Sequence, residues 1–339
     1  MLLIFASLGV GLITVCLIAI FGPISRPIGL VDKPCVRKNH SRPVPLVGGL
    51  ALYISVVLTL TFLPAPFSLS WLLASSAIIV LIGCLDDLVG LTVGTRLFCQ
   101  FLTTCIMASV SDIWITDLGI DFISIDIDGW FSVALTVLVV VGLTNAFNLS
   151  DGIDGLACGQ FITCLACLYL AQLVSESQIL YEYWLLAFAS ASVAFFLVNV
   201  KVTPIEKVFL GDAGSLFIGF SASWFLIIYS QPPLSSLEPV AALWCVTIPA
   251  WDTLVVVLKR LREGRSIFEA GRDHLHHLFV DRGVKSNRAL TVILLLSMAL
   301  NSMGIAVTYC FHPEAGIALY VILFAIFAYA RLLEEPRQS

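Results

Sequence analysis

Charged side chains are scarce in this sequence. Asp, Glu, Lys and Arg make up 12% of the 339 residues, whereas about a quarter of the residues of a typical soluble domain are charged. Hydrophobic residues make up 59%, and the mean hydropathy is +1.00. We therefore exclude an ordinary soluble protein and predict an integral membrane protein that contacts the lipid bilayer. The sequence also lacks internal repeats and low-complexity tracts, so residues 1–339 are expected to form a single membrane domain.

Apolar segments recur along the whole chain, at lengths suited to crossing a hydrocarbon core of about 30 Å as helices. The predicted fold class is therefore an all-α polytopic membrane protein with about eleven transmembrane helices. An odd number of spans places the two termini on opposite faces of the membrane. We place the spans near residues 2–21, 45–63, 70–85, 97–111, 130–147, 156–174, 183–200, 213–230, 238–258, 289–310 and 316–333.

Half of the expected loops contain no Lys or Arg. All 18 Lys and Arg lie in the alternate loops and the C-terminal tail. Because cytoplasmic loops are enriched in these residues, the N-terminus is expected to be periplasmic and the C-terminus cytoplasmic. The first span is expected to be a retained anchor, since its basic residues follow the apolar segment. The cytoplasmic loops are residues 22–44, 86–96, 148–155, 201–212 and 259–288.

Two features lie away from the basic loops. The segment from Ser111 to Trp130 carries five Asp among Ile and Phe residues, and we interpret it as a small periplasmic β-hairpin or, alternatively, a solvated acidic loop. Cys164 and Cys167 form a C-x-x-C within an apolar run. That environment indicates packing by small side chains rather than a redox or zinc site.

Four polar clusters lie in or beside the cytoplasmic loops. The first is Asp86-Asp87, at the end of the third span. Two adjacent carboxylates repel each other, so either one of them holds a proton or a cation lies between them. Alternatively, the pair only marks the end of a span at the water interface.

The second cluster, residues 145–155, has two Asn and two Asp at a spacing of three. A charged side chain at the bilayer centre costs about 2.5–3.5 kcal/mol, so these side chains are expected to face water, a metal or a ligand. On a helix, Asn148, Asp151 and Asp154 would share one flank and could converge on one ligand. Gly152 would let the backbone approach that ligand. An irregular turn between helices is the alternative, although it leaves the carboxylates unexplained.

The third cluster is Lys-Val-Phe-Leu-Gly-Asp-Ala-Gly-Ser at residues 207–215, and it leads directly into a span. Small residues at a helix start expose backbone N–H groups to an anion, and Asp212 beside them could hold a divalent ion that bridges to that anion. A generic N-cap by Asp212 is the simpler alternative.

The fourth cluster is Arg272-Asp273-His274-Leu275-His276-His277, in the loop that carries eight cations. Its spacing differs from that of a zinc-binding His pair on a helix. Binding of phosphate through imidazole and guanidinium donors is therefore favoured.

Together these clusters indicate a reaction class. Carboxylates that can hold Mg²⁺, an anion site flanked by glycine and a basic loop are the parts of a phosphoryl-transfer site. Because they gather at the membrane surface, one substrate is expected to be a lipid phosphate and the other a soluble, phosphate-activated donor. A membrane transporter is the competing class, but transporters place coupling residues near the midplane and often contain internal repeats. No nucleic acid is expected as a partner.

Five ordered motifs carry a resemblance over nearly the whole chain. They are residues 31–34 with Arg37-Lys38 and residues 45–49, then Asp86-Asp87, residues 145–155, residues 208–215 and residues 274–277. In these motifs the chain resembles the polyprenyl-phosphate N-acetylhexosamine-1-phosphate transferases of glycosyltransferase family 4, which are MraY-like, and most of all their bacterial WecA type. A departure from the family pattern is Cys35, where the family often has Asn.

The resemblance implies an activity. UDP-N-acetylglucosamine would donate its sugar 1-phosphate to undecaprenyl phosphate, with UMP as the second product and Mg²⁺ or Mn²⁺ as the cofactor. The reaction would initiate O-antigen or another surface polysaccharide in the bacterial inner membrane, with the active site on the cytoplasmic face and a homodimer as the expected assembly. A different UDP-N-acetylhexosamine donor is the alternative.

The resemblance also implies roles for single residues. Asp212 is the expected metal ligand, with Asn148 as a second ligand or pyrophosphate contact. Phe209 would lie against the uracil base. The candidate catalytic residues are Asp86, Asp87, Asp151, Asp154, His274, His276 and His277. The candidate substrate-binding residues are Arg37, Lys38, Arg96, Asn145, Asn148, Gly152, Ile153, Asn199, Phe209, Gly211 and Arg272.

Two questions stay open at this point. The lipid phosphate could attack the donor directly, or Asp86, Asp87 or Asp151 could first form a covalent intermediate. Asp252 lies inside a predicted span, where the cost of burying a charge indicates a function, but the sequence assigns it no role.

Overall fold

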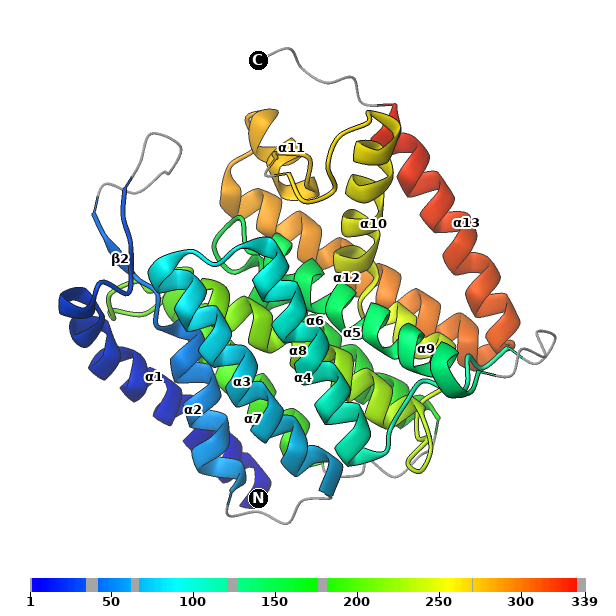
Figure 1. Cartoon of the computed structure of the whole chain (residues 1–339), viewed down its shortest axis with the longest axis horizontal. Helices are drawn as coiled ribbons and strands as arrows, with labels where there is room; N and C mark the ends of the chain where they lie inside the picture. The colour runs from blue at the N-terminus through cyan, green and yellow to red at the C-terminus, as the bar shows by residue number, and fades with distance from the viewer. Residues whose placement is uncertain are drawn as a thin grey trace.

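The computed structural model describes residues 2–34, 42–61, 67–120, 127–175, 182–269 and 271–333. Within these ranges the chain is almost entirely helical, and its helices form a bundle (Figure 1). The helices are α1 (Leu2–Ile28), α2 (Gly48–Leu60), α3 (Phe67–Val89), α4 (Val93–Ser111), α5 (Gly129–Ser150), α6 (Leu156–Val174), α7 (Glu182–Asn199), α8 (Gly211–Ser230), α9 (Pro239–Trp244), α10 (Thr247–Arg262), α11 (Leu275–Asp281), α12 (Ser286–Cys310) and α13 (Pro313–Leu332). Strands β1 (Val31–Asp32) and β2 (Val44–Pro45) pair antiparallel.

The predicted class, an all-α polytopic membrane protein, is confirmed. In the described part of the chain, nine helices are long and apolar enough to cross a membrane, namely α1, α3 to α8, α12 and α13. The two other expected spans correspond to α2, which has 13 residues, and to the pair α9 and α10. Helical hydrogen bonding is interrupted between α9 and α10. One carbonyl there, that of Cys245, accepts from the side-chain amide of Asn301 at 3.2 Å instead.

Several helices extend beyond the spans expected from hydropathy. Helix α3 continues through Asp86 and Asp87, α5 continues to Ser150, and α8 begins at Gly211. Polar residues that were expected in loops therefore lie on helix ends, where the helical backbone fixes their direction.

The segment from Ser111 to Trp130 differs from the expected hairpin. Its described residues contain no strand, and residues 121–126 lie outside the described ranges. Ile113 and Ile115 turn inward and are buried. The backbone N–H groups of Thr116 and Asp117 do not pair with a strand. They donate to the side-chain oxygen of Gln231 at 2.9 and 3.0 Å.

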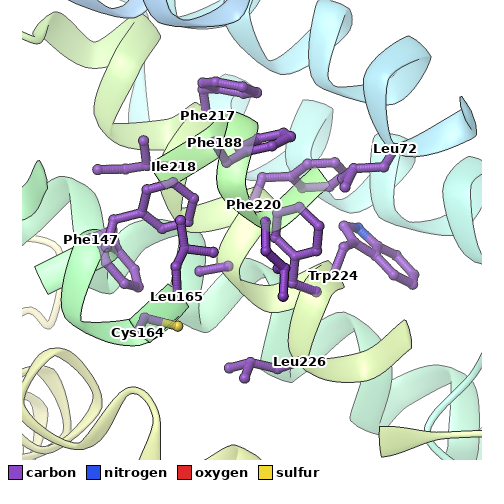
Figure 2. Close-up of a cluster of buried hydrophobic side chains, with 14 of the residues drawn as sticks. Leu72, Phe147, Cys164, Leu165, Phe188, Phe217, Ile218, Phe220, Trp224 and Leu226 are labelled. Atoms are coloured by element: carbon purple, nitrogen blue, oxygen red, sulfur yellow. The ribbon is translucent and has the colours of Figure 1, made fainter. Parts of the chain in front are cut away.

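Helix α8 is the centre of the bundle. Every residue of α8 except Asp212 is buried, and the helix packs against α2, α3, α5 and α6. Aromatic side chains fill the space around it, as Figure 2 shows for Phe188, Phe217 and Phe220. Cys164 lies at the edge of this cluster, and both thiols of the C-x-x-C are free and buried, in keeping with a packing role.

Glycine allows the neighbouring helices to approach the backbone of α8. A Cβ atom on Gly49 of α2 would lie 2.2 Å from the backbone nitrogen of Gly214, and one on Gly83 of α3 would lie 2.3 Å from Cα of Ala213. Close approach through small residues is a common way for membrane helices to associate. These contacts fix the ends of α2 and α3 against the first turn of α8.

This packing makes a testable prediction. Gly83→Ala is expected to lower the unfolding free energy by about 1–3 kcal/mol, because the added methyl group overpacks against backbone that cannot rotate away. The measurement is the thermal midpoint of the purified protein in detergent. Gly142→Ala on α5 is the matched control, since no atom lies within 4 Å of its added Cβ. Equal midpoints for the two variants would contradict the close packing.

Candidate active site

A cavity of about 1100 Å³ lies at the end of the bundle that carries β2 and α11, at the top of Figure 1. Its walls come from the segment around β1 and β2, the ends of α3 and α5, the turn after α5, the segment before α8, and α11. Most of the predicted site residues line it. They are Asp86, Asp87, Asn148, Asp151, Gly152, Ile153, Asp154, Asn199, Phe209, Gly211, Asp212, Arg272 and His277.

Asp87 caps the first turn of α8. Its carboxylate accepts from the backbone N–H groups of Asp212 at 2.9 Å and Ala213 at 3.2 Å. A Cβ on Gly211 would lie 2.6 Å from this carboxylate, and the backbone there has a φ of +72°, so glycine is needed on both counts. Both Asp87 oxygens are thus engaged at the helix N-terminus, where a carboxylate is favoured by the helix dipole.

Asp86 is held by a different set of donors. One oxygen accepts from the backbone N–H of Leu91 at 2.6 Å, and the other accepts from the Arg96 guanidinium at 2.7 Å. Arg96, a candidate substrate-binding residue, therefore pairs with a protein carboxylate. The same guanidinium lies 4.0 Å from a carboxylate oxygen of Asp212, so it remains beside the cavity.

Asn148 joins α5 to α8. Its side-chain nitrogen donates to the Asp212 carboxylate at 2.7 Å and to the Ser215 hydroxyl at 2.9 Å. These bonds place Asn148 and Asp212, the two predicted metal ligands, next to each other at the cavity wall.

Asp151 and Asp154 do not share a helix with Asn148, so the single-helix interpretation of this run is wrong. Helix α5 ends at Ser150, and a turn leads to Gly155, which precedes α6 and has a φ of +78°. This turn, rather than a continuous helix, brings Asp151 and Asp154 to the same cavity as Asn148. Burial, followed by the negative charges of Asp212, Asp154 and Asp87, raises the pKa of Asp151 to about 8.

Lys207 is a cavity residue that was not singled out from the sequence. Its ammonium group lies 2.5 Å from the Asp154 carboxylate and 4.6 Å from the centre of the Phe209 ring. The signal was present, because Lys207 opens the third cluster, residues 207–215, and a cation close to an anion site is common. The first loop also contributes Asp32 and Arg42 to the lining.

Asn199 connects the two turns that border the cavity. Its side-chain oxygen accepts from the N–H of Gly155 at 2.6 Å, and its side-chain nitrogen donates to the carbonyl of Val208 at 2.8 Å. The amide, expected to bind substrate, is thus committed on both sides to protein backbone.

The three histidines occupy different environments. Only His277 lines the cavity, together with Arg272, whose guanidinium is 2.5 Å from the Asp281 carboxylate. His276 is buried against the turn after α5, because a Cβ on Gly152 would lie 1.9 Å from its Nε2. Burial and then the charge of His277 lower the pKa of His276 to about 3, so His276 is neutral.

Asp273 lies close to three cationic side chains. Its carboxylate lies 3.2 Å from Lys259, 3.4 Å from Arg260 and 3.7 Å from Arg265. Burial alone would raise its pKa, but the hydrogen bond and charge of Lys259 and the charges of the two arginines lower it. These contacts indicate a structural role for Asp273, which ties its loop to the end of α10.

Besides Arg96, His274 and His276, three predicted residues are not among the described lining residues. Arg37 and Lys38 lie outside the described residues. Asn145 is not part of the cavity lining, because it lies one turn before Asn148 and donates to the Gln100 side chain at 2.6 Å and to the carbonyl of Val141 at 2.8 Å.

The fold and this cavity define a class of protein, a polytopic membrane protein with a charged cavity. Its acidic wall consists of Asp86, Asp87, Asp151, Asp154 and Asp212, and its basic wall is the loop with α11 that carries Arg272 and His277. A model of the family described as glycosyl transferase family 4 matches residues 69–230, which run from α3 to the end of α8. The chain belongs to this family, as the motifs predicted.

Similarity to single proteins extends further along the chain. Over 317 residues, 92% of this chain and 86% of the relative, it is 32% identical to the undecaprenyl-phosphate alpha-N-acetylglucosaminyl 1-phosphate transferase of Escherichia coli K12. Proteins of the same name are 35% identical over 309 residues in Yersinia pestis, with 89% and 84% covered, and 31% identical over 323 residues in Haemophilus influenzae, with 91% and 88% covered.

The contact between Gly152 and His276 can be tested. Gly152→Ala is expected to lower kcat by about 10-fold or more, because the new methyl group cannot share space with the imidazole and must displace α11 from the cavity. The measurement is the rate of sugar 1-phosphate transfer by the purified variant. Gly94→Ala is the control, as its Cβ would meet only the Thr92 hydroxyl at 4.0 Å. Full activity of Gly152→Ala would show that the ring position does not matter.

Proposed function

We propose that this protein transfers N-acetylglucosamine 1-phosphate from UDP-N-acetylglucosamine to undecaprenyl phosphate, giving undecaprenyl-pyrophosphoryl-N-acetylglucosamine and UMP. The observation that carries the proposal is similarity, over 89 to 92% of the chain, to transferases named for this activity. The cavity supports it, because a phosphorylated donor needs cationic groups such as Arg272 and Lys207 beside oxygen ligands for a metal. The product would start O-antigen or another surface polysaccharide.

The proposed location is the cytoplasmic face of the bacterial inner membrane. The lining includes Arg42, Lys201, Lys207 and Arg272, all from loops assigned to the cytoplasm by their excess of Lys and Arg. A nucleotide-sugar donor is soluble and a polyprenyl phosphate is confined to the bilayer, so a cavity at a membrane surface suits both.

Mg²⁺ is the proposed cofactor, with Mn²⁺ as a substitute. Asp212 and Asn148 present the oxygen donors that such hard cations prefer. The carboxylates of Asp87 and Asp151 support the fit, because they line the same cavity as Asp212 and so many negative charges in one place favour a bound cation. The described residues contain no group of three His, Cys, Asp or Glu placed to hold a metal ion. Substrate phosphates and water are therefore expected to complete the shell, as is usual for Mg²⁺, and the bound ion would neutralise charge on the phosphates.

Direct attack by the lipid phosphate is the mechanism that the geometry favours. An oxygen of undecaprenyl phosphate forms a bond to the β-phosphorus of the donor, and the bond from that phosphorus to the oxygen bridging to the α-phosphate breaks, which releases UMP. A phosphate monoester is largely anionic at neutral pH, so no strong base is required. The oxygens of Asp86 and Asp87 already accept hydrogen bonds from Arg96 and from backbone, which favours positioning roles for both.

The remaining residues are assigned by their place on the walls. Asp154 and the backbone of Gly152 and Ile153 would lie near the uridine, with Phe209 against the base. Lys207 joins this group, because it pairs with Asp154 and lies over the Phe209 ring. Arg272 and His277 would contact the pyrophosphate or the sugar from the opposite side.

Removal of the metal ligand tests the function. Purified protein with UDP-N-acetylglucosamine, undecaprenyl phosphate and Mg²⁺ should release UMP, and Asp212→Ala should lower kcat by about 100-fold or more, because charge on the transferring phosphates loses its main support. EDTA should abolish turnover. Asp112→Asn is the control, since Asp112 caps α4 in the left-handed conformation that Asn also adopts.

Activity that persists in EDTA would reject the metal. A separate assay with a panel of UDP-sugars would identify the donor.

An isotope-exchange assay separates the two mechanisms. With direct attack, labelled UMP should not enter UDP-N-acetylglucosamine when lipid acceptor is absent, because no sugar-phosphate is left on the enzyme. The same mixture with undecaprenyl phosphate added is the positive control. Exchange without the lipid would instead indicate a covalent aspartyl intermediate, for which Asp151→Asn should then abolish exchange.

A further inference from the structure

Three buried polar residues from three distant segments meet behind the basic wall. Asp252 lies on α10, His274 precedes α11, and Arg331 lies near the end of α13. Their exposed fractions are 5%, 4% and 7%, so water cannot take the place of their mutual contacts. A charge is retained at such a site only when it is paired and hydrogen-bonded.

The Asp252 carboxylate accepts hydrogen bonds from all sides of this junction. One oxygen faces Nδ1 of His274 at 2.9 Å. The other accepts from the backbone N–H of Leu275 at 2.9 Å and from the Arg331 guanidinium at 2.8 Å. Because an ionised carboxylate only accepts, Nδ1 of His274 must carry a hydrogen. The contact with Leu275 also satisfies one of the N–H groups at the start of α11.

Arg331 contacts the loop at a second point. Its other terminal nitrogen donates to the backbone carbonyl of Asp273 at 2.5 Å. The planar guanidinium therefore joins the side chain of Asp252 to the backbone of the residue before His274. A lysine has one nitrogen and could not reproduce this two-point geometry.

A row of imidazole rings leads from this junction to the cavity. The rings of His274 and His276 are nearly parallel, with centroids 6.0 Å apart, and those of His276 and His277 are 4.2 Å apart. His276 abuts Gly152, and His277 alone of the three lines the cavity. The direction of His277 thus depends on a loop whose anchor is Asp252.

We propose that Asp252, Arg331 and His274 are positioning residues of the transferase, and that His274 does not itself contact substrate. Asp252 and Arg331 hold the start of α11 so that His277 and Arg272 face the reacting phosphates. This inference deepens the proposed function and rests on it. It assigns a role to Asp252 and to the last helix, and it moves His274 from the catalytic group to the supporting structure.

The competing explanation is that the buried charges only stabilise the fold. The double variant Asp252→Leu with Arg331→Met separates the two ideas. Replacing both members of a buried ion pair by apolar groups often leaves stability unchanged or raises it, whereas removing one member leaves an unpaired charge. The double variant should therefore fold, but its loop lacks the anchor.

The experiment measures kcat, KM for UDP-N-acetylglucosamine, the thermal midpoint and backbone hydrogen exchange over residues 272–281. In the folded double variant we expect kcat to fall by about 10- to 100-fold, the range typical of residues that orient a catalytic group, with KM changed by less than about threefold. Exchange over residues 272–281 should become faster. Gln231→Met is the matched control, because Gln231 is buried and ties a different loop to the bundle through Thr116 and Asp117. It should lower the thermal midpoint without changing kcat.

A folded double variant with wild-type kcat and unchanged exchange would overturn the proposal. If the double variant does not fold, Arg331→Lys decides the question, since it keeps the charge and loses one of the two contacts. A kcat at least about 10-fold below wild type supports the two-point anchor, and wild-type activity overturns it.

The proposed function can fail separately. If the wild-type protein releases no UMP from any UDP-sugar tested, that function is wrong, while hydrogen exchange in the same variants still reports whether Asp252 and Arg331 hold the loop. His274→Asn should weaken protection over residues 272–281, and unchanged protection in that variant would remove His274 from the anchor.

Discussion

The hydrogen bonds from the start of α8 to the Asp87 carboxylate are the constraint on which the site depends. Every residue of α8 except Asp212 is buried, so the N–H groups of its first turn need acceptors in the protein. Asp87 supplies them, and the contact of Gly83 with Ala213 holds α3 at the right distance one turn away. Asp212 is thereby fixed beside Asn148 on α5.

The two walls of the cavity are built in different ways. The acidic wall consists largely of helix ends at one end of the bundle, where burial and then the neighbouring negative charges raise the pKa of Asp151 to about 8. The basic wall consists of a long loop and the short helix α11, held together by contacts of Asp273 and Asp252. The acidic wall is the site of the proposed metal ion, and the basic wall is the site of the proposed contacts to the pyrophosphate or the sugar.

Much of this arrangement could be predicted from the sequence, because bilayer crossing and charge burial are local costs. Hydropathy located the spans, and the expense of intramembrane carboxylates located the acidic clusters. The ends of helices could be predicted less accurately, because hydropathy falls at Asp86 whereas α3 continues to Val89. The sequence could not pair Asp252 with Arg331, because the partners are separated by 79 positions and neither lies in a motif. It also gave no means to separate His277 from His274 and His276.

The placement of Arg331 has a consequence for biosynthesis. A ribosome makes α10, the basic loop and α11 before it makes α13, so the start of α11 lacks its guanidinium partner until the last helix has entered the membrane. The acidic wall, by contrast, is complete once α8 is inserted. The residues proposed to hold the cation are therefore in place before the start of α11 has its last anchor, and a nascent chain halted before α13 would have the acidic wall without an anchored basic wall.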